Sequence, residues 1–166
     1  MESIRLKARA KINLGLDVIG RRENGYHDVR MVMQTVGLYD RIIMTRIPEE
    51  EIRIKTNIGF LPVNENNLVY KAIMLMKNKY KLDGGIEVDL NKFIPVAAGM
   101  AGGSSDAACA LFGMNRLFEL NVPMKELMKI GVEIGADVPY CLMRGTALAE
   151  GIGEKLTRLP DMPFCH

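Results

Sequence analysis

The sequence predicts an α+β fold, with most strands early in the chain and helices packed on one face of the sheet. The first 56 residues are dominated by a period-two alternation of apolar and polar residues, which is typical of half-buried strands. Residues 67–134 instead carry three apolar stripes at helical spacing. Turn residues separate these stretches, and we find no repeat, low-complexity segment or linker. We therefore expect one domain with a sizeable core.

Four strands are expected before the first helix, and the first is the clearest. Residues 4–18 place an apolar side chain at every even position and a polar residue or glycine at every odd one. This pattern predicts one long bent strand, or two strands, with the even positions on a core. Lys11 and Asn13 then emerge on the same, non-core side. After a turn and loop at residues 20–28, the other strands are predicted at residues 30–37, 41–46 and 51–56.

Three helices and three further strands follow. Asn67 is predicted to cap the first helix, whose apolar stripe runs to Tyr80. Pro123 is predicted to open the third helix, and Gly135 to end it. The remaining predicted elements are a strand at residues 86–90, a central buried helix at 107–118, and a strand pair at 140–149 and 154–159.

Composition and charge disfavour two classes of partner. The 22 Lys and Arg residues nearly balance the 20 Asp and Glu residues and are scattered along the chain, so nothing points to nucleic acid or a membrane surface. No segment approaches the apolar length of a membrane span, and the charged N-terminus is unlike a signal peptide. Cys109, Cys141 and Cys165 lack metal-ligand spacing and cannot all pair, and Cys109 is expected in the core. A reducing compartment follows, with cytoplasm as the expected location.

Residues 95–105, P-V-A-A-G-M-A-G-G-S-S, are the most informative stretch of the chain. Small residues let the backbone approach a ligand closely, and the unpaired N–H groups of the following helix point into the bend. The helix dipole favours an anion there, and phosphate is its usual occupant. The alternative is a plain turn before a helix, in which Ser104, Ser105 and Asp106 are only capping residues. The letters match neither the P-loop nor the dinucleotide-binding G-x-G-x-x-G pattern.

Three polar positions outside this loop could carry chemistry, although each also has an ordinary structural explanation. Lys11 with Asn13 could line a cleft, or could be the solvated face of an edge strand. Asp137, in Gly-Ala-Asp-Val-Pro, could act in catalysis or be a turn residue after a helix. Tyr26 and His27 could bind a ligand or lie on a surface loop. None of them decides the function alone.

Taken in order along the chain, these motifs resemble the GHMP kinases, the superfamily of galactokinase and of homoserine, mevalonate and phosphomevalonate kinases. The similarity runs from about residue 6 to 160. It is highest to the branch that phosphorylates a cytidine diphosphate-linked methylerythritol in the non-mevalonate isoprenoid pathway. The segments that carry it are A-K-I-N-L-G-L (10–16), R-R-E-N-G-Y-H (21–27), the loop followed by D-A-A, G-A-D-V-P (135–139) and A-L-A-E-G-I-G-E (147–154).

The resemblance implies both a fold and a reaction. The fold is that of the second domain of ribosomal protein S5, with a mixed, mainly antiparallel sheet. The reaction is transfer of a phosphoryl group from ATP, accompanied by Mg²⁺, to the 2-hydroxyl of the methylerythritol unit in a bacterial cytoplasm. No ligand of the metal ion is assigned.

The resemblance also implies a set of site residues. Lys11 and Asp137 would be catalytic, with Asp137 accepting the substrate proton or orienting the hydroxyl, and Lys11 holding Asp137 ionised. Substrate would be bound by Asn13, Tyr26 and His27, and the adenine would lie near Asn66, Asn67 and Lys92. The ATP-binding residues would be Pro95, Val96, Ala97, Ala98, Gly99, Met100, Ala101, Gly102, Gly103, Ser104 and Ser105.

Two departures from the family pattern qualify this interpretation. Family loops are often richer in glycine, whereas this loop has Ala97, Ala98 and Ala101. Family members are also nearly twice as long, and their C-terminal domain carries part of the substrate wall. Residues 1–166 are therefore expected to be the N-terminal, ATP-binding domain, whose cleft the missing C-terminal domain would complete. Two alternatives stay open: another GHMP small-molecule kinase, which the Gly-Tyr-His motif disfavours, and a nucleotide-binding fragment without activity.

Overall fold

One mixed sheet runs through the part of the chain that the structure, a computed structural model, describes: residues 2–163 without 24 and 26. Four of the five described strand pairs are antiparallel and only β3 with β4 is parallel, so the predicted mixed, mainly antiparallel sheet is confirmed. The strands are β1 (Ser3–Arg21), β2 (His27–Ile47), β3 (Ile52–Thr56), β4 (Gly85–Asn91), β5 (Thr146–Gly151) and β6 (Lys155–Arg158).

The long strand β2 organises the sheet. Its antiparallel partner β1 runs along one edge, while β4 pairs with residues 41–47 and β5 with residues 29–34. The two strands predicted at 30–37 and 41–46 are therefore one strand. An irregularity in the ladder, where Arg9 pairs with Tyr39 but Lys11 with Thr35, marks the place where they were expected to separate. β1 pairs only with β2 in the described sheet, so it is an edge strand.

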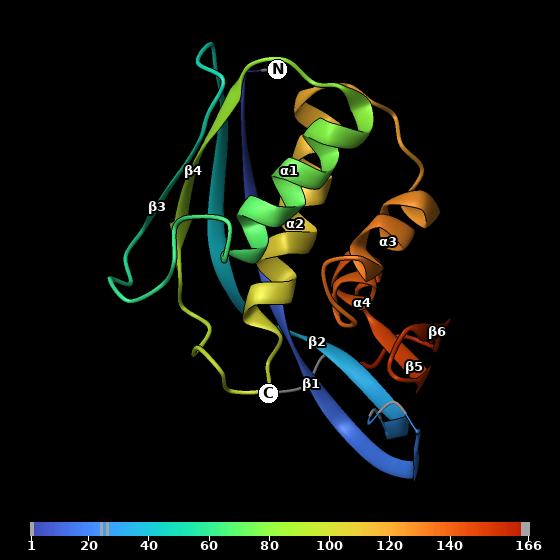
Figure 1. Ribbon diagram of the computed structural model, residues 1–166. Coiled ribbons are helices and arrows are strands. Elements are labelled where there is room, and N and C mark those ends of the chain that lie inside the picture. The colour runs from blue at the N-terminus through green and yellow to red at the C-terminus, as the bar shows by residue number, and fades with distance from the viewer. Residues whose placement is uncertain (1, 24, 26, 164–166) are drawn as a thin grey trace.

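Four helices cover one face of the sheet (Figure 1). They are α1 (Leu68–Tyr80), α2 (Gly102–Leu117), α3 (Met124–Val132) and α4 (Val138–Met143). The predicted start of α1 is confirmed, because the Asn67 side chain accepts a hydrogen bond from the Val69 N–H at 2.9 Å. Pro123 is the residue at the start of α3, as predicted. No helix in the described residues is long and apolar enough to cross a membrane.

Helix α2 lies at the centre of the core, as its apolar residues on both sides predicted. It contacts the other three helices and both long strands. Its Leu111 and Met114 are fully buried together with Ile42 and Met44 of β2. Cys109, on the same helix, is also buried, as expected. This packing fixes the position of the loop that leads into the helix.

The strand predicted at residues 140–149 is wrong in its first half. Residues 138–143 form α4, and β5 begins only at Thr146. All of Val138 to Leu142 is buried, and Pro139 occupies the first helical turn, where its missing N–H costs nothing. A short, continuously apolar run does not distinguish a buried helix from a buried strand.

The expectation that one face of the first strand lies on a core holds only for its first half. Ala8 and Ala10 are fully buried, but Ile12, Leu14, Leu16 and Val18 are 37%, 48%, 50% and 60% exposed. The reason is that β1 and β2 extend as an arm beyond the helices that cover the start of the strand (Figure 1). Register shifts after Arg9, Asn13 and Val18 also interrupt the alternation.

Candidate active site

The Gly-rich loop forms one wall of a cavity of about 410 Å³. This volume is within the range of small-molecule pockets. Residues 95–104 of the loop line it, as do residues 66–68 at the start of α1. The other lining residues are Leu61, Pro62, Leu90, Lys92, Asp106 and Asp137. The cavity thus gathers three predicted groups: the phosphate loop, the surroundings of adenine and one of the two catalytic residues.

The loop has the backbone conformation of an anion cradle. Ala97, Gly99 and Ala101 have φ values of 60°, 73° and 54°, so left-handed residues recur at every second position. Such residues turn the chain back on itself and are typical of concave backbone sites for anions. Helix α2 follows at once, and its first residues, Gly102 and Gly103, line the cavity. A helix start leaves its first N–H groups without partners inside the helix.

The capping explanation of the polar residues after the loop is wrong. Helix α2 begins at Gly102, and its cap residue, Ala101, makes no side-chain capping hydrogen bond. Ser105 and Asp106 lie within the helix and are buried. Ser105 Oγ donates a hydrogen bond to the Arg9 carbonyl at 2.7 Å, and Asp106 pairs with Lys92. Both side chains connect the helix to other elements.

Strand β1 holds the far end of the loop. The backbone N–H of Lys11 donates to the Met100 carbonyl at 3.1 Å, close to the Ser105–Arg9 hydrogen bond. The loop therefore docks on the free edge of β1 beside the predicted catalytic lysine. Ser105 does not line the cavity; it lies beneath the loop and is 2% exposed.

The two predicted catalytic residues meet, although 126 positions separate them. Lys11 Nζ lies 3.7 Å from Asp137 Oδ2 and donates a hydrogen bond to Asn13 Oδ1 at 3.1 Å. The Lys11 side chain is 6% exposed and that of Asp137 31%, so the carboxylate is the more accessible group. At this distance the two opposite charges attract each other. The predicted pairing of Lys11 and Asn13 on one side of the strand is found as well.

A buried tyrosine fixes the helix that follows Asp137. The Tyr140 hydroxyl donates a hydrogen bond to the Gly145 carbonyl at 2.7 Å and lies 3.1 Å from Thr35 Oγ1. Thr35 Oγ1 in turn accepts a hydrogen bond from the Gly145 N–H. Thr35 is the cross-strand partner of Lys11. This network therefore ties α4, and with it Asp137, to the strand pair that carries the lysine.

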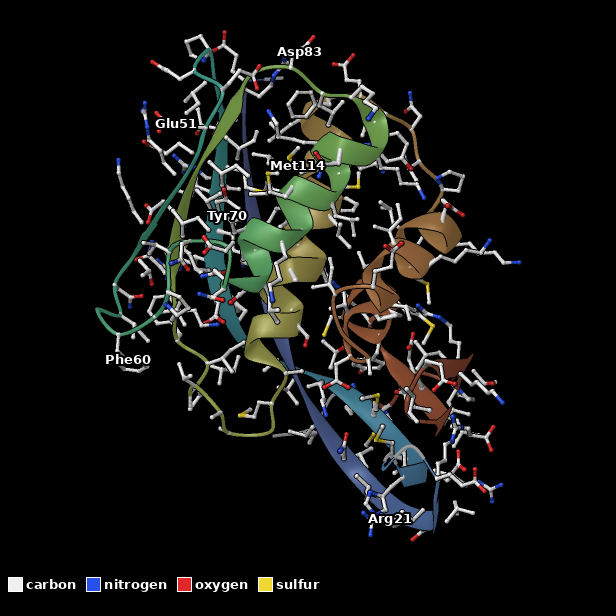
Figure 2. All side chains as sticks on the ribbon, viewed as in Figure 1. Arg21, Glu51, Phe60, Tyr70, Asp83 and Met114 are labelled. Carbon is white, nitrogen blue, oxygen red and sulfur yellow. The ribbon has the colours of Figure 1, made fainter. Side chains whose placement is uncertain are left out.

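Two residues of the substrate-binding prediction belong to the region between β1 and β2, and the structure does not test their role. Tyr26 lies outside the described residues. His27 begins β2 and is exposed, and it pairs with Arg21 at the far end of the arm (Figure 2). His27 is not part of the cavity wall.

Sequence reasoning missed two buried polar networks. One joins Tyr140 to Thr35, and the other joins Asp40 to Lys92 and Asp106. The available signal for the second was Asp40 itself, a charged residue in a strand rich in apolar side chains, because such a charge requires a partner when buried. Asp106 gave no such signal, since an acidic residue at a helix start is common.

Comparison with known proteins gives one consistent family. A family model described as GHMP kinases N terminal domain matches residues 67–145. Two proteins called 4-diphosphocytidyl-2-C-methyl-D-erythritol kinase, from Lachnospira eligens and Lachnoclostridium phytofermentans, are 99% and 61% identical over 166 residues. The chain spans 58% and 57% of their lengths.

Solved structures agree with this result. A crystal structure of 4-(cytidine 5'-diphospho)-2C-methyl-D-erythritol kinase is similar with a TM-score of 0.82 and 35% identity, over 94% of this chain and 55% of that one. Homoserine kinase from Cytophaga hutchinsonii has a TM-score of 0.78 at 21% identity, over 96% of this chain and 52% of its own, which supports the fold alone.

Proposed function

The chain belongs to the GHMP kinase family, and we propose that it is the ATP-binding, N-terminal domain of a kinase that phosphorylates an alcohol. The proposed acceptor is the 2-hydroxyl of 4-diphosphocytidyl-2-C-methyl-D-erythritol, an intermediate of the non-mevalonate isoprenoid pathway. The names of the relatives support this substrate. The observation that carries the proposal is the Lys11–Asp137 pair beside a cavity walled by the Gly-rich loop.

In the proposed reaction, the substrate hydroxyl oxygen attacks the γ-phosphorus of ATP. A bond forms between that oxygen and phosphorus, the bond from phosphorus to the β,γ-bridging oxygen breaks, and ADP leaves. The hydroxyl proton passes to the carboxylate of Asp137, the accessible member of the pair. Phosphoryl transfer depends mainly on alignment and on neutralising phosphate charge. The loop and the start of α2 would hold the phosphates, and Lys11, paired with Asp137, would polarise the hydroxyl.

The metal ion would enter with the nucleotide. The described residues contain no group of three His, Cys, Asp or Glu side chains that could hold a cation. Mg²⁺ is commonly bound through substrate phosphates and water rather than in a cage built by the protein. We therefore propose Mg·ATP as the nucleotide substrate, with charge neutralisation on the phosphates as the contribution of the ion, and we assign it no protein ligand.

The rest of the substrate and a second domain would complete the cleft. The arm formed by β1 and β2 presents His27 at its tip, and we propose that His27 and its neighbour in sequence, Tyr26, contact the cytidine end of the substrate. Ile12, Leu14, Leu16 and Val18 are exposed along the same arm. We propose that the C-terminal part of the enzyme covers this apolar surface and that residues 1–166 are the N-terminal domain. A bacterial cytoplasm is the proposed location.

The direct test is ADP release by the purified chain with Mg·ATP and the cytidine diphosphate-linked alcohol. Substitution of Asp137 by Asn should lower turnover by about 10² to 10⁴-fold, the usual contribution of a positioned acid–base group. Asp83→Asn is the matched control and should leave turnover unchanged, since Asp83 is an exposed carboxylate at the end of the molecule away from Arg21 and the arm (Figure 2) and does not line the cavity. Equal turnover in the Asp137→Asn variant would contradict the assigned role.

A second function is favoured by the length of the chain relative to its relatives. Residues 1–166 could bind nucleotide without catalysing transfer. Mg·ATP should then raise the melting temperature although no ADP is released, because a ligand that binds only the folded state stabilises it. Absence of both turnover and stabilisation would refute nucleotide binding by this chain.

A further inference from the structure

Three buried charged residues meet behind the Gly-rich loop. Lys92 Nζ donates a hydrogen bond to Asp106 Oδ2 at 2.5 Å and another to Asp40 Oδ2. The exposed fractions of Asp40, Lys92 and Asp106 are 0%, 6% and 3%. They come from three places in the chain: strand β2, the segment after β4, and helix α2.

This cluster ties together the two ends of the loop. On the entry side, Asp40 Oδ1 accepts hydrogen bonds from the backbone N–H groups of Phe93 and Ile94, at 2.5 and 2.8 Å. On the exit side, Asp106 lies in the second turn of α2. The Lys92 ammonium is bonded to both carboxylates, so it connects the start of the loop to the helix that follows it.

The backbone of Lys92 is itself held in place. Its N–H donates to Asn57 Oδ1 at 2.8 Å, and its carbonyl accepts from Asn57 Nδ2 at 3.0 Å. Lys92 is therefore a fixed point rather than a flexible surface cation. Its contacts with the two carboxylates therefore join the elements at the two ends of the loop.

The charges of the cluster do not balance. Two carboxylates share one ammonium, and Asp106 Oδ1 has no hydrogen-bond partner among the described residues. Burial, with a smaller contribution from the nearby Asp40, raises the pKa of Asp106 to about 8, although Lys92 acts in the opposite direction. A proton on Asp106 would remove the uncompensated buried charge, which is costly in a low dielectric.

We propose that Asp40, Lys92 and Asp106 are positioning residues that set the span of the phosphate loop, and that they do so while Asp106 carries a proton. Loss of that proton leaves two carboxylates facing one ammonium, and the repulsion loosens the exit of the loop. The nucleotide then binds more weakly, whereas the Lys11–Asp137 pair is unchanged. Nucleotide binding by the loop rests on the proposed function, whereas the role of the three residues in setting the span of the loop does not depend on it.

The other ionisable groups near Asp106 do not account for a change in the loop near pH 8. Burial raises the pKa of the Cys109 thiol to about 11 and that of the Cys141 thiol further, so both stay protonated well above pH 8. Helix α1 packs on α2 through buried apolar side chains. The charged or titratable groups that face this region from the packed elements are Asp40, Lys92, Lys11 with Asp137, the two thiols, and Arg144 beside Cys109.

Two measurements test the cluster without any nucleotide. The side-chain carboxyl carbon of Asp106, followed by ¹³C NMR, should titrate with a midpoint near pH 8. Hydrogen exchange of the amides at residues 96–101, corrected for the intrinsic effect of pH, should speed up between pH 7 and 9. Asp106→Asn keeps the shape of the side chain and removes its titration, so exchange in that variant should not change with pH.

Nucleotide affinity gives the functional readout. At pH 9 a group with a pKa of about 8 is about nine-tenths deprotonated, so the Kd of the wild-type chain for Mg·ATP should rise about tenfold from pH 7 to pH 9. In Asp106→Asn the Kd should change less than about twofold. Asp89→Asn, which removes an exposed carboxylate on β4, is the control and should keep the wild-type pH dependence.

Each of these measurements has a result that overturns the proposal. An Asp106 carboxyl that titrates near its ordinary value of about 4, or loop exchange that does not depend on pH in the wild-type chain, overturns the proposal. The same follows if the Kd of Asp106→Asn weakens with pH as in the wild type. If the wild-type chain binds no Mg·ATP at pH 7, the proposed function fails, while NMR and exchange still decide the role of the cluster. If Asp106→Asn does not fold, the NMR and exchange measurements on the wild-type chain still test the role of the cluster.

Discussion

Removing the hydroxyl of Ser105 should destabilise the protein by about 1 to 2 kcal/mol. The hydroxyl donates to the Arg9 carbonyl at 2.7 Å, and Ser105 is 2% exposed, so water cannot replace it without rearrangement. In Ser105→Ala the carbonyl loses its side-chain partner, and an unsatisfied buried acceptor costs about 1 to 3 kcal/mol. Alanine is the better helix former by a few tenths of a kcal/mol, which offsets part of this cost. The loss of the hydrogen bond is the larger effect.

Thermal and urea unfolding measure this change. For a chain of 166 residues, 1 to 2 kcal/mol corresponds to a decrease in Tm of about 2 to 8 °C. The urea midpoint should fall while the m-value stays the same, because the surface exposed on unfolding hardly changes. Affinity for Mg·ATP should also fall, since the hydrogen bond holds the end of the loop against β1.

A second serine provides the control. Ser3 Oγ lies 3.1 Å from Thr45 Oγ1 on the exposed part of β1, where water can take the place of either hydroxyl. Ser3→Ala should therefore change the unfolding free energy by less than about 0.5 kcal/mol. If Ser105→Ala were as stable as the wild type, or lost no more stability than Ser3→Ala, the assigned docking of α2 on β1 would be wrong.

Four further substitutions test the fold, each by its effect on the urea midpoint. Gly85→Ala should cost about 3 kcal/mol or more, because the new methyl group meets the backbone carbonyl of Glu51, which cannot move without disturbing the β3–β4 ladder. Ala101→Gly should leave stability unchanged or raise it by up to about 1 kcal/mol, because it relieves a left-handed alanine. Ala98→Gly, at a position without positive φ, should lower stability by about 0.4 to 1 kcal/mol, and equal effects of these two changes would contradict the loop conformation. Tyr140→Phe should cost about 1 to 3 kcal/mol, because the carbonyl that accepts from its buried hydroxyl at 2.7 Å loses that partner; an unchanged midpoint would show that the hydrogen bond is not made.

The parts of the fold that the sequence predicted are those with a strong local signal. The caps at Asn67 and Pro123 and the apolar stripe of α2 depend on neighbouring residues, and the structure agrees with them. The errors in the predicted elements lie in segments whose structure depends on packing against residues far away in the sequence. The first five side chains of residues 138–143 are all buried, and a continuous apolar run of this length does not distinguish a helix from a strand.

How much of the site the sequence predicts differs from residue to residue. Lys11, Asp137 and the loop were found through the order of motifs; the structure places Asp137 and the loop on the wall of one cavity, with Lys11 3.7 Å from Asp137. The exposure of Ile12 to Val18 was not predictable, because alternation shows that one face is apolar but not what covers it. Asp40 and Asp106 were missed because their meeting depends on three elements that are far apart in sequence.

The edge position of β1 links the Gly-rich loop to Lys11, the proposed catalytic lysine. An edge strand has unpaired backbone groups, and at Arg9 and Lys11 these groups are taken by Ser105 and by the carbonyl of Met100. The same residue, Lys11, thus supplies a backbone N–H that holds the loop and a side chain that lies beside Asp137. A shift of the loop on its ligand must act on the backbone of Lys11, so filling the loop and aligning the lysine are not independent events. A regular inner strand could not do this, because its N–H groups would already be paired within the sheet.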